Sequence, residues 1–200
     1  MFDILLTVLT CVEGISLMEE SYIESSVRTR LIIAGISELE ERGIRDFSLR
    51  RCAIRAQVSC AAPYRHFRDK EDFLSEIIKY IASRWELLYR EIEKAFSNDL
   101  RRRIIELAVL NLRFWIANPN YRSVFMSLSP SGTNTLLDFD GALLSLIEEY
   151  CVGTEYDAEL KKYAVRALIY GSLTLAEGGD RAAVTELLRK KMEEEFPKRD

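Results

Sequence analysis

The sequence predicts an all-α protein of about nine helices, and three observations support this prediction. Apolar residues recur at helical spacing in one segment after another, as in residues 73–92. Residues that commonly cap helices precede most of these segments, and glycine or polar residues often end them. No segment reads as a confident strand. With 200 residues, 48% of them hydrophobic and 30% charged, the chain is globular and can bury a real core.

The predicted helices follow one another with short connections. Ser25 or Ser26 can cap the first helix and Gly43 can end it, while Ser48, Ser59 and Asp69 can cap the next three. The expected ranges are 27–42, 49–57, 60–67, 70–95, 100–117, 119–127, 135–151, 155–177 and 181–196. Three consecutive arginines open the helix at 100–117, and such a run of charge is expected to be a solvated face.

Residues 48–72 carry the most specific pattern in the chain. Two short helices with small apolar residues inside, joined by a three-residue turn, suit a helix-turn-helix whose second helix enters a DNA major groove. Residues 45–70 hold seven cationic side chains and two anionic ones, a net charge of +5, although the whole chain has a net charge of −4. A basic patch on an acidic chain is the electrostatic footprint expected of a DNA-binding face.

The same residues resemble a known family. Their types and spacing resemble those of the TetR family of bacterial transcriptional regulators. The residues that carry the resemblance are Ser48, Ala53, the turn Ala56-Gln57-Val58-Ser59, the run Tyr64-Arg65-His66-Phe67-Arg68-Asp69-Lys70-Glu71, and Leu74. The resemblance covers roughly residues 26–74. Gln57 departs from it, because the family usually has glycine there. A left-handed backbone at this position would cost glutamine on the order of 1 kcal/mol.

The resemblance implies two groups of DNA contacts, expected to involve double-stranded operator DNA. Residues suited to clamp phosphates are Ser48, Tyr64, His66 and Lys70. Residues suited to read base edges are Arg50, Cys60, Ala61, Ala62 and Arg65, with phosphate contact equally open to the two arginines. Simpler roles remain open: Ser48 as a helix cap only, Tyr64 and His66 as packing residues, and Lys70 as surface. Cys60 is open to a redox role as well as to that of a small groove residue.

The resemblance also implies a C-terminal domain that binds a small-molecule effector and forms a homodimer. The helices at 155–177 and 181–196 are expected to pair with their copies in a four-helix interface. A weaker pattern places a ligand pocket among Trp85, Tyr89, Leu112, Trp115, Phe125 and Phe139, although aromatic residues at helical spacing are more often core. The ligand would favour a state whose recognition helices no longer match two half-sites about 34 Å apart.

Other functional classes find little support in the sequence. The cysteines at positions 11, 52, 60 and 151 have no metal-ligand spacing, and there is a single histidine, so no metal site and no cofactor are expected. No nucleophile–base pair or phosphate loop is visible, which argues against an enzyme. The alternative to a DNA-binding regulator is a protein-interaction module that has repurposed the helix-turn-helix.

The first residues of the chain allow two interpretations. Residues 1–24 form an apolar extension that is either a short helix packed on the body or a consequence of a mis-called start, with translation beginning at Met18. The apolar run 4–12 is too short to span a bilayer, so a cytoplasmic protein is expected. The expected domains are the extension at 1–24, the DNA-binding domain at 25–74, and the ligand-binding and dimerisation domain at 75–200.

Overall fold

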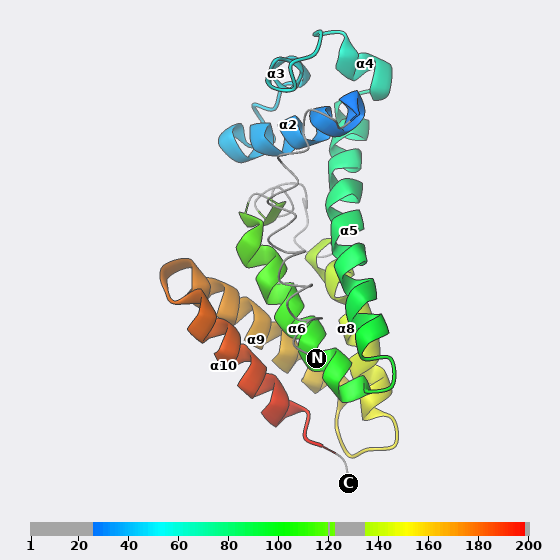
Figure 1. Ribbon diagram of the computed structural model, residues 1–200, viewed down its shortest axis with the longest axis vertical. Coiled ribbons are helices and arrows are strands. Elements are labelled where there is room, and N and C mark those ends of the chain that lie inside the picture. The colour runs from blue at the N-terminus through cyan, green and yellow to red at the C-terminus, as the bar shows by residue number, and fades with distance from the viewer. Residues whose placement is uncertain (1–25, 120, 123–134, 199–200) are drawn as a thin grey trace. The chain divides into compact units, whose positions relative to one another are not determined.

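The described residues are 26–119, 121–122 and 135–198 of a computed structural model, and eight α-helices account for most of their regular structure (Figure 1). Within these ranges there is no strand, which confirms the all-α prediction. The helices are α2 (Val27–Arg42), α3 (Leu49–Arg55), α4 (Ala62–His66), α5 (Lys70–Ala95), α6 (Leu100–Ala117), α8 (Thr135–Cys151), α9 (Ala158–Gly178) and α10 (Arg181–Glu195). The predicted extension at 1–24 and most of the predicted helix at 119–127 lie outside the described residues.

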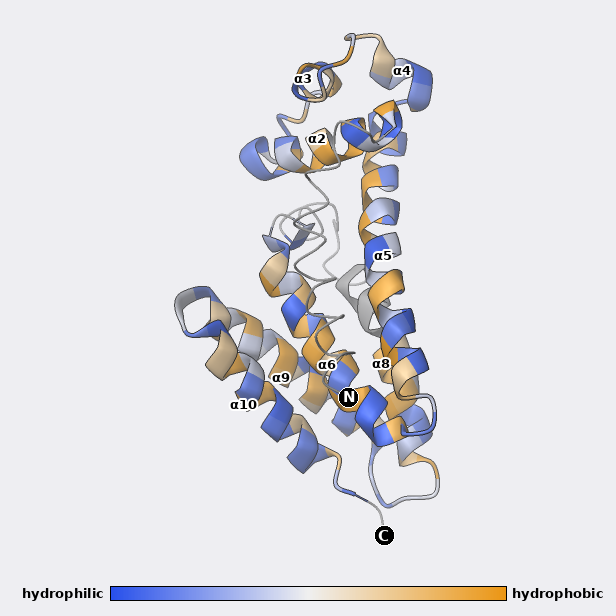
Figure 2. Cartoon of the chain, viewed as in Figure 1, coloured by the Kyte–Doolittle hydropathy of each residue, from blue (hydrophilic) through white to orange (hydrophobic). Residues whose placement is uncertain are grey.

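The described residues fall into two compact units. The N-terminal unit contains residues 26–85, 118–119, 121–122 and 135–136, and the C-terminal unit contains residues 86–117 and 137–198. The long helix α5 contributes residues to both units. Its amphipathic pattern is visible in Figure 2, where hydrophobic and hydrophilic residues alternate around the helix.

Local capping explains where several helices begin. The Ser26 hydroxyl accepts the Thr29 backbone N–H at 3.2 Å, and Gly43 ends α2 with a positive φ of 69°, as the sequence predicted. The Asp157 carboxylate accepts the Leu160 N–H at 3.1 Å. Because Asp157 is the cap, α9 begins at Ala158 and not at the predicted residue 155.

Two further boundaries differ from the prediction. The helix expected at 60–67 is observed only over Ala62–His66, because residues 60–61 form a turn in which the Ala62 N–H donates to the Ser59 carbonyl at 2.8 Å. Its N-cap residue is therefore Ala61 and not Ser59. The helix expected at 49–57 ends at Arg55, where a turn described below begins.

The core of the N-terminal unit brings α2 against the first turns of α5. Phe47, Phe67 and Phe73 are buried, with ring centroids 5.7 Å apart for Phe47–Phe73 and 4.4 Å apart for Phe67–Phe73. Gly35 of α2 lies so close to α5 that a Cβ added there would be 2.4 Å from Cε1 of Phe73 and 2.8 Å from Cδ1 of Ile77. Only glycine therefore fits at this crossing without rearrangement of its neighbours.

The C-terminal unit is built on α6, which packs against both α9 and α10. Every residue of α6 from Ile104 to Leu112 is buried. One of them is a carboxylate, Glu106, which accepts hydrogen bonds from Nη1 and Nη2 of Arg189 at 2.6 and 2.9 Å. Nε of Arg102 lies 2.8 Å from the same carboxylate. These ion pairs compensate a charge whose burial would otherwise be costly.

The C-terminal end of α10 is fastened by side chains from three other helices. Arg101 of α6 donates to the carbonyl oxygen of Phe196, and Lys161 of α9 donates to that of Glu195 at 2.6 Å. The Tyr150 hydroxyl of α8 donates to the carbonyl of Pro197 at 2.9 Å. The Phe196 ring is fully buried. Carbonyl groups that a helix end leaves unpaired thus find partners here, two of them cationic, as the helix dipole favours.

This arrangement corrects one expectation from the sequence. The arginine run at 101–103 is not a solvated face, because all three side chains are half-buried and bound within the chain. Arg101 holds α10, Arg102 faces Glu106, and Nη2 of Arg103 donates to the Ser97 carbonyl at 2.8 Å.

In the described part of the chain, each helix is too short or too polar to cross a membrane. The same residues contain no cluster of three or more histidine, cysteine or acidic side chains that could hold a metal ion.

Candidate nucleic-acid interface

The start of α3 leaves a hydroxyl available. Ser48 is the N-cap residue, as predicted, with extended backbone angles (φ −133°, ψ 117°), and its carbonyl accepts the Cys52 N–H at 3.1 Å. Its side chain, however, makes no capping hydrogen bond. The half-buried hydroxyl is therefore free to bind another group at a helix N-terminus, where backbone N–H groups favour anions.

The turn after α3 is a Schellman motif with glutamine at its left-handed position. The Val58 N–H donates to the Ala53 carbonyl at 3.0 Å, and the Gln57 N–H donates to the Ile54 carbonyl at 3.1 Å. Gln57 itself has a φ of 54°, the only positive φ at a non-glycine residue of the described chain. These two bonds satisfy carbonyls at the end of α3. The turn predicted from the sequence thus forms, with the backbone strain expected of glutamine there.

The short helix α4 exposes most of the residues expected to meet DNA. Tyr64 is 65% exposed, and Arg65 and His66 are exposed as well. Cys60 and Ala61, in the turn before α4, are also exposed. Ala62, by contrast, is only 8% exposed, because it packs into the core behind the helix together with Pro63. Ala62 therefore offers little of its methyl group to a base.

The seven cationic side chains of residues 45–70 divide into two groups. Four are bound within the chain: Arg51 to Glu38, Arg55 to Glu41, Arg68 to Asp72, and Lys70 to a backbone carbonyl. The other three are Arg45, Arg50 and Arg65, all exposed, and no hydrogen bond or ion pair joins them to the described part of the chain. A phosphate or base could therefore bind these three guanidinium groups without first breaking an internal contact.

The paired arginines are held by carboxylates of α2. Nη2 of Arg55 lies 2.6 Å from Oε2 of Glu41. This hydrogen bond lowers the pKa of Glu41 and raises the pKa of Arg55, so both groups are charged at neutral pH. The carboxylate of Glu38, which is almost completely buried, accepts a hydrogen bond from Nε of Arg51 at 2.5 Å. The two ion pairs connect α3 to α2.

Lys70 begins α5 and faces the link between α2 and α3. Its Nζ donates to the Ile44 carbonyl at 2.8 Å and lies 5.5 Å from the centroid of the Phe47 ring. The start of α5 is capped as predicted, because the Asp69 carboxylate accepts the Asp72 N–H at 2.8 Å. The Asp72 carboxylate in turn accepts the Arg68 N–H, and this hydrogen bond is the main cause of the lowered pKa of Asp72.

The cysteines of this unit differ in their surroundings. Cys52 of α3 is completely buried, and burial, assisted by the nearby Glu38 charge, raises the pKa of its thiol to about 12. Cys60 is exposed and forms no disulfide. A thiol reagent in solution can therefore reach Cys60 and not Cys52.

The predicted ligand-pocket residues are distributed over both units. Leu112 and Trp115 are buried in α6, Tyr89 is half-buried in α5, and Trp85 belongs to the N-terminal unit. Phe125 and the side chain of Phe139 lie outside what the structure describes. The pocket prediction therefore stays a prediction.

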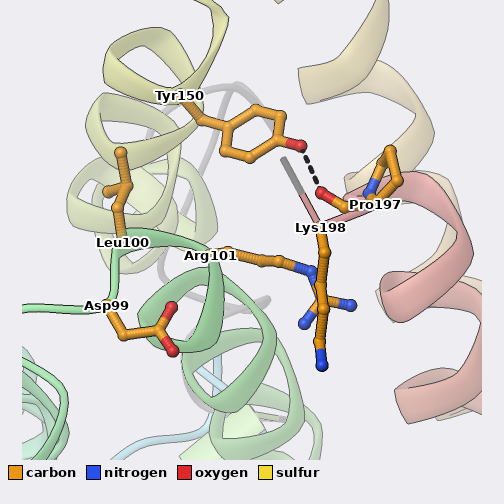
Figure 3. Close-up of a pocket in the computed structure, with 6 residues that line it drawn as sticks. All are labelled: Asp99, Leu100, Arg101, Tyr150, Pro197 and Lys198. Atoms are coloured by element: carbon orange, nitrogen blue, oxygen red, sulfur yellow. Dashed lines mark hydrogen bonds between the residues drawn. The ribbon is translucent and has the colours of Figure 1, made fainter. Parts of the chain in front are cut away.

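A different cleft is present in the C-terminal unit, with a volume of about 350 Å³. Figure 3 shows its lining, in which Arg101 and Lys198 lie close to the hydrogen bond between Tyr150 and Pro197. Asp99 and Leu100 complete it. None of the six residues was expected from the sequence to bind a ligand, because the cleft is formed by segments far apart in the chain.

Comparison with known proteins agrees with this geometry. Residues 31–77 match the family described as bacterial regulatory proteins, tetR family. No curated protein matches the chain by sequence. Among solved structures, a protein with unknown function from Rhodococcus sp. RHA1 has a TM-score of 0.66 at 22% identity, covering 87% of this chain and 97% of that one.

Two further structures carry descriptions that agree with the family. The putative transcriptional regulator SCO4942 from Streptomyces coelicolor has a TM-score of 0.64 at 18% identity, covering 87% of this chain and 100% of its own. The TetR family transcriptional regulator PfmR from Thermus thermophilus has a TM-score of 0.60 at 21% identity, with 88% and 98% coverage. Proteins of this family bind DNA and are not enzymes. Residues 31–77 are therefore similar to the TetR family of bacterial transcriptional regulators, and the fold of the chain is similar to that of these solved structures.

Proposed function

We propose that this DNA-binding regulator is a homodimeric repressor that binds a palindromic operator and is released by a small molecule. The observation that carries the proposal is the set of three exposed arginines, Arg45, Arg50 and Arg65, that have no partner in the described chain although the neighbouring Arg51 and Arg55 are paired. Unpaired guanidinium groups around a helix-turn-helix segment supply the phosphate and guanine contacts that such a protein needs.

The roles of the other contacts follow from their exposure. Ser48, with its uncapped hydroxyl, and the exposed Tyr64 and His66 would bind phosphates and fix the register of the protein on the duplex. Lys70 would join them at the start of α5, because its ammonium group has three N–H donors and the Ile44 carbonyl uses only one. Arg50 and Arg65 would read base edges or bind phosphates. The exposed Cys60 and Ala61 would lie against the groove, with Ala62 contributing less than expected from the sequence.

Dimerisation would use α9 and α10. Four large apolar side chains on these helices are exposed in the single chain: Leu160 (68%), Tyr163 (65%), Leu175 (57%) and Leu187 (46%). Solvent-exposed apolar residues that recur along two neighbouring helices are suited to pairing with a second copy. Gly171 is also exposed on α9, and a Cβ built there meets no atom within 4 Å.

Gly171 provides a test of the interface. Because Gly171 is exposed and an added Cβ meets no atom within 4 Å, Gly171→Glu should leave the fold intact while it blocks close approach of a partner helix. A matched control is Gly141→Glu on α8, where an added Cβ also meets nothing within 4 Å. Sedimentation velocity should show monomers for the first variant and dimers for the second. Dimers in both would place the interface elsewhere.

Release by a small molecule would work through a shift of population. The effector would bind more tightly to a state in which the two recognition helices do not match half-sites about 34 Å apart. The pocket would include Trp85, Tyr89, Leu112, Trp115, Phe125 and Phe139. Their aromatic and aliphatic side chains would suit a largely apolar effector.

Fluorescence anisotropy with DNA from upstream of the gene for this protein tests the proposal. We expect tight binding, a clear preference over scrambled DNA and a logarithm of affinity that falls steeply with the logarithm of salt concentration. An Arg65→Gln variant should lose affinity, whereas Arg55→Gln, whose side chain is bound to Glu41 at 2.6 Å, should lose less. Absence of salt-sensitive binding to any duplex from a random-sequence pool would instead favour the protein-interaction module.

A further inference from the structure

The link between α2 and α3, residues 43–48, is held at two of its backbone carbonyls. Nζ of Lys70 donates to the Ile44 carbonyl at 2.8 Å, and Nη2 of Arg51 donates to the Asp46 carbonyl. The next residue, Phe47, is buried in the core of the unit. A connecting segment that lies at the protein surface is thus fixed from α3, from α5 and from the core.

Arg45 lies between the two bound carbonyls. Its side chain is exposed, and it makes no hydrogen bond or ion pair with the described part of the chain. The neighbouring Asp46 forms no ion pair with it. Because the backbone on both sides of Arg45 is already fixed, binding of its guanidinium to another group requires the ordering of one side chain only, which keeps the entropic cost of that contact small.

The position of this link relative to the expected contacts indicates what Arg45 can bind. Lys70, which fastens Ile44, and Ser48, which ends the link, both belong to the residues expected to clamp DNA phosphates. Arg45 is therefore tethered beside them through the backbone of residues 44–48. An exposed guanidinium without a carboxylate partner, in this place, is suited to a phosphate oxygen.

We propose that Arg45 is a further phosphate contact, one that the sequence pattern does not assign, and that Lys70 and Arg51 position it by fastening the link. The assignment rests on the proposed function, because it requires that this face binds DNA. It deepens that function by adding one contact on each protomer, outside both helices of the helix-turn-helix.

The test is the salt dependence of binding to a duplex that the wild-type protein selects from a random-sequence pool. Each phosphate contact contributes about 0.9 to the slope of log affinity against log salt, so removal of two contacts per dimer in Arg45→Gln should reduce the slope by about 1.8. The loss of affinity relative to wild type should therefore be roughly tenfold larger at 50 mM than at 200 mM salt. Arg45→Lys, which keeps the charge, should retain most of the slope.

Arg55→Gln is the matched control, because it removes the same charge from a side chain that is already bound to Glu41 at 2.6 Å. Its slope should stay at the wild-type value. Equal slopes for Arg45→Gln and the wild type, with intact folding by circular dichroism, would overturn the assignment and leave the proposed function standing. Equal reductions in both variants would also overturn it, since they would reflect net charge alone. Failure of the wild-type protein to select any duplex would overturn the proposed function, and the assignment with it.

Discussion

Replacement of Gln57 by glycine should stabilise the protein. Gln57 is exposed, holds a φ of 54° at the left-handed position of the turn after α3, and no hydrogen bond or ion pair of its side chain is found among the described residues. A left-handed conformation costs an ordinary residue about 1–2 kcal/mol, which glycine avoids. Glycine loses more conformational entropy on folding, about 0.4–1 kcal/mol. With the middle of each range, Gln57→Gly should raise the free energy of unfolding by about 0.8 kcal/mol.

Urea unfolding followed by circular dichroism, at one fixed protein concentration, measures this gain. We expect a higher midpoint with an unchanged slope m, and a rise in Tm of about 2–4 °C for each kcal/mol in a chain of this size. Gln57→Asn should lie between wild type and glycine, because asparagine tolerates the left-handed region better than glutamine does. Gln57→Ala keeps a Cβ and should give no gain.

The ranking of these three variants identifies the cause of any change. If Gln57→Gly were no more stable than wild type, the backbone strain assigned to this turn would be wrong. If alanine stabilised the protein as much as glycine, the gain would come from loss of the glutamine side chain and not from the backbone.

Three more substitutions test the packing of the two units. Gly35→Ala should lower the free energy of unfolding by about 1 kcal/mol, because overpacking against Phe73 costs about 1–3 kcal/mol and the higher helix propensity of alanine offsets about 1 kcal/mol of this. An unchanged Tm would contradict the close approach of α2 and α5. Phe196→Ala should cost about 3–5 kcal/mol in thermal unfolding, as for other fully buried phenylalanines, and a loss below 1 would show that the ring is dispensable. Glu106→Gln should cost about 3–5 kcal/mol by leaving Arg189 without its buried partner. In a double-mutant cycle, the variant that carries both Glu106→Gln and Arg189→Gln should lose less stability than the sum of the two single losses. Equality with that sum would refute the coupling between Glu106 and Arg189.

Features encoded within a few residues of sequence were predictable. The ranges 27–42, 70–95, 100–117 and 135–151 agree with α2, α5, α6 and α8, because capping residues and glycine mark several of their ends. The left-handed backbone of Gln57 was expected from the resemblance, because the family usually has glycine at this position of the turn. The start of α4 was wrong by two residues, because a turn and a helical N-terminus look alike in a run of small residues.

Features that depend on distant partners were not predictable. The arginines at 101–103 read as a solvated run, but one of their partners, Phe196, lies 95 residues further along the chain. The same limit applies to the face proposed to bind DNA. The sequence shows seven cationic side chains there, but it does not show which of them form ion pairs with carboxylates of α2. The structure shows that Arg45, Arg50 and Arg65 are the exposed cations among these seven that form no ion pair with the described residues.

The spacing of these partners along the chain has a consequence for synthesis. Contacts that fasten α2, α3 and the first turns of α5 to one another join residues up to 48 positions apart, as between Arg28 and Glu76. Those of α6 reach 83 residues from Glu106 to Arg189 and 95 from Arg101 to Phe196. At about 5–20 residues per second, translation leaves α6 without these partners for roughly 5–20 s. The C-terminal unit can therefore complete its packing on α6 only after residues 189–196 have been synthesised.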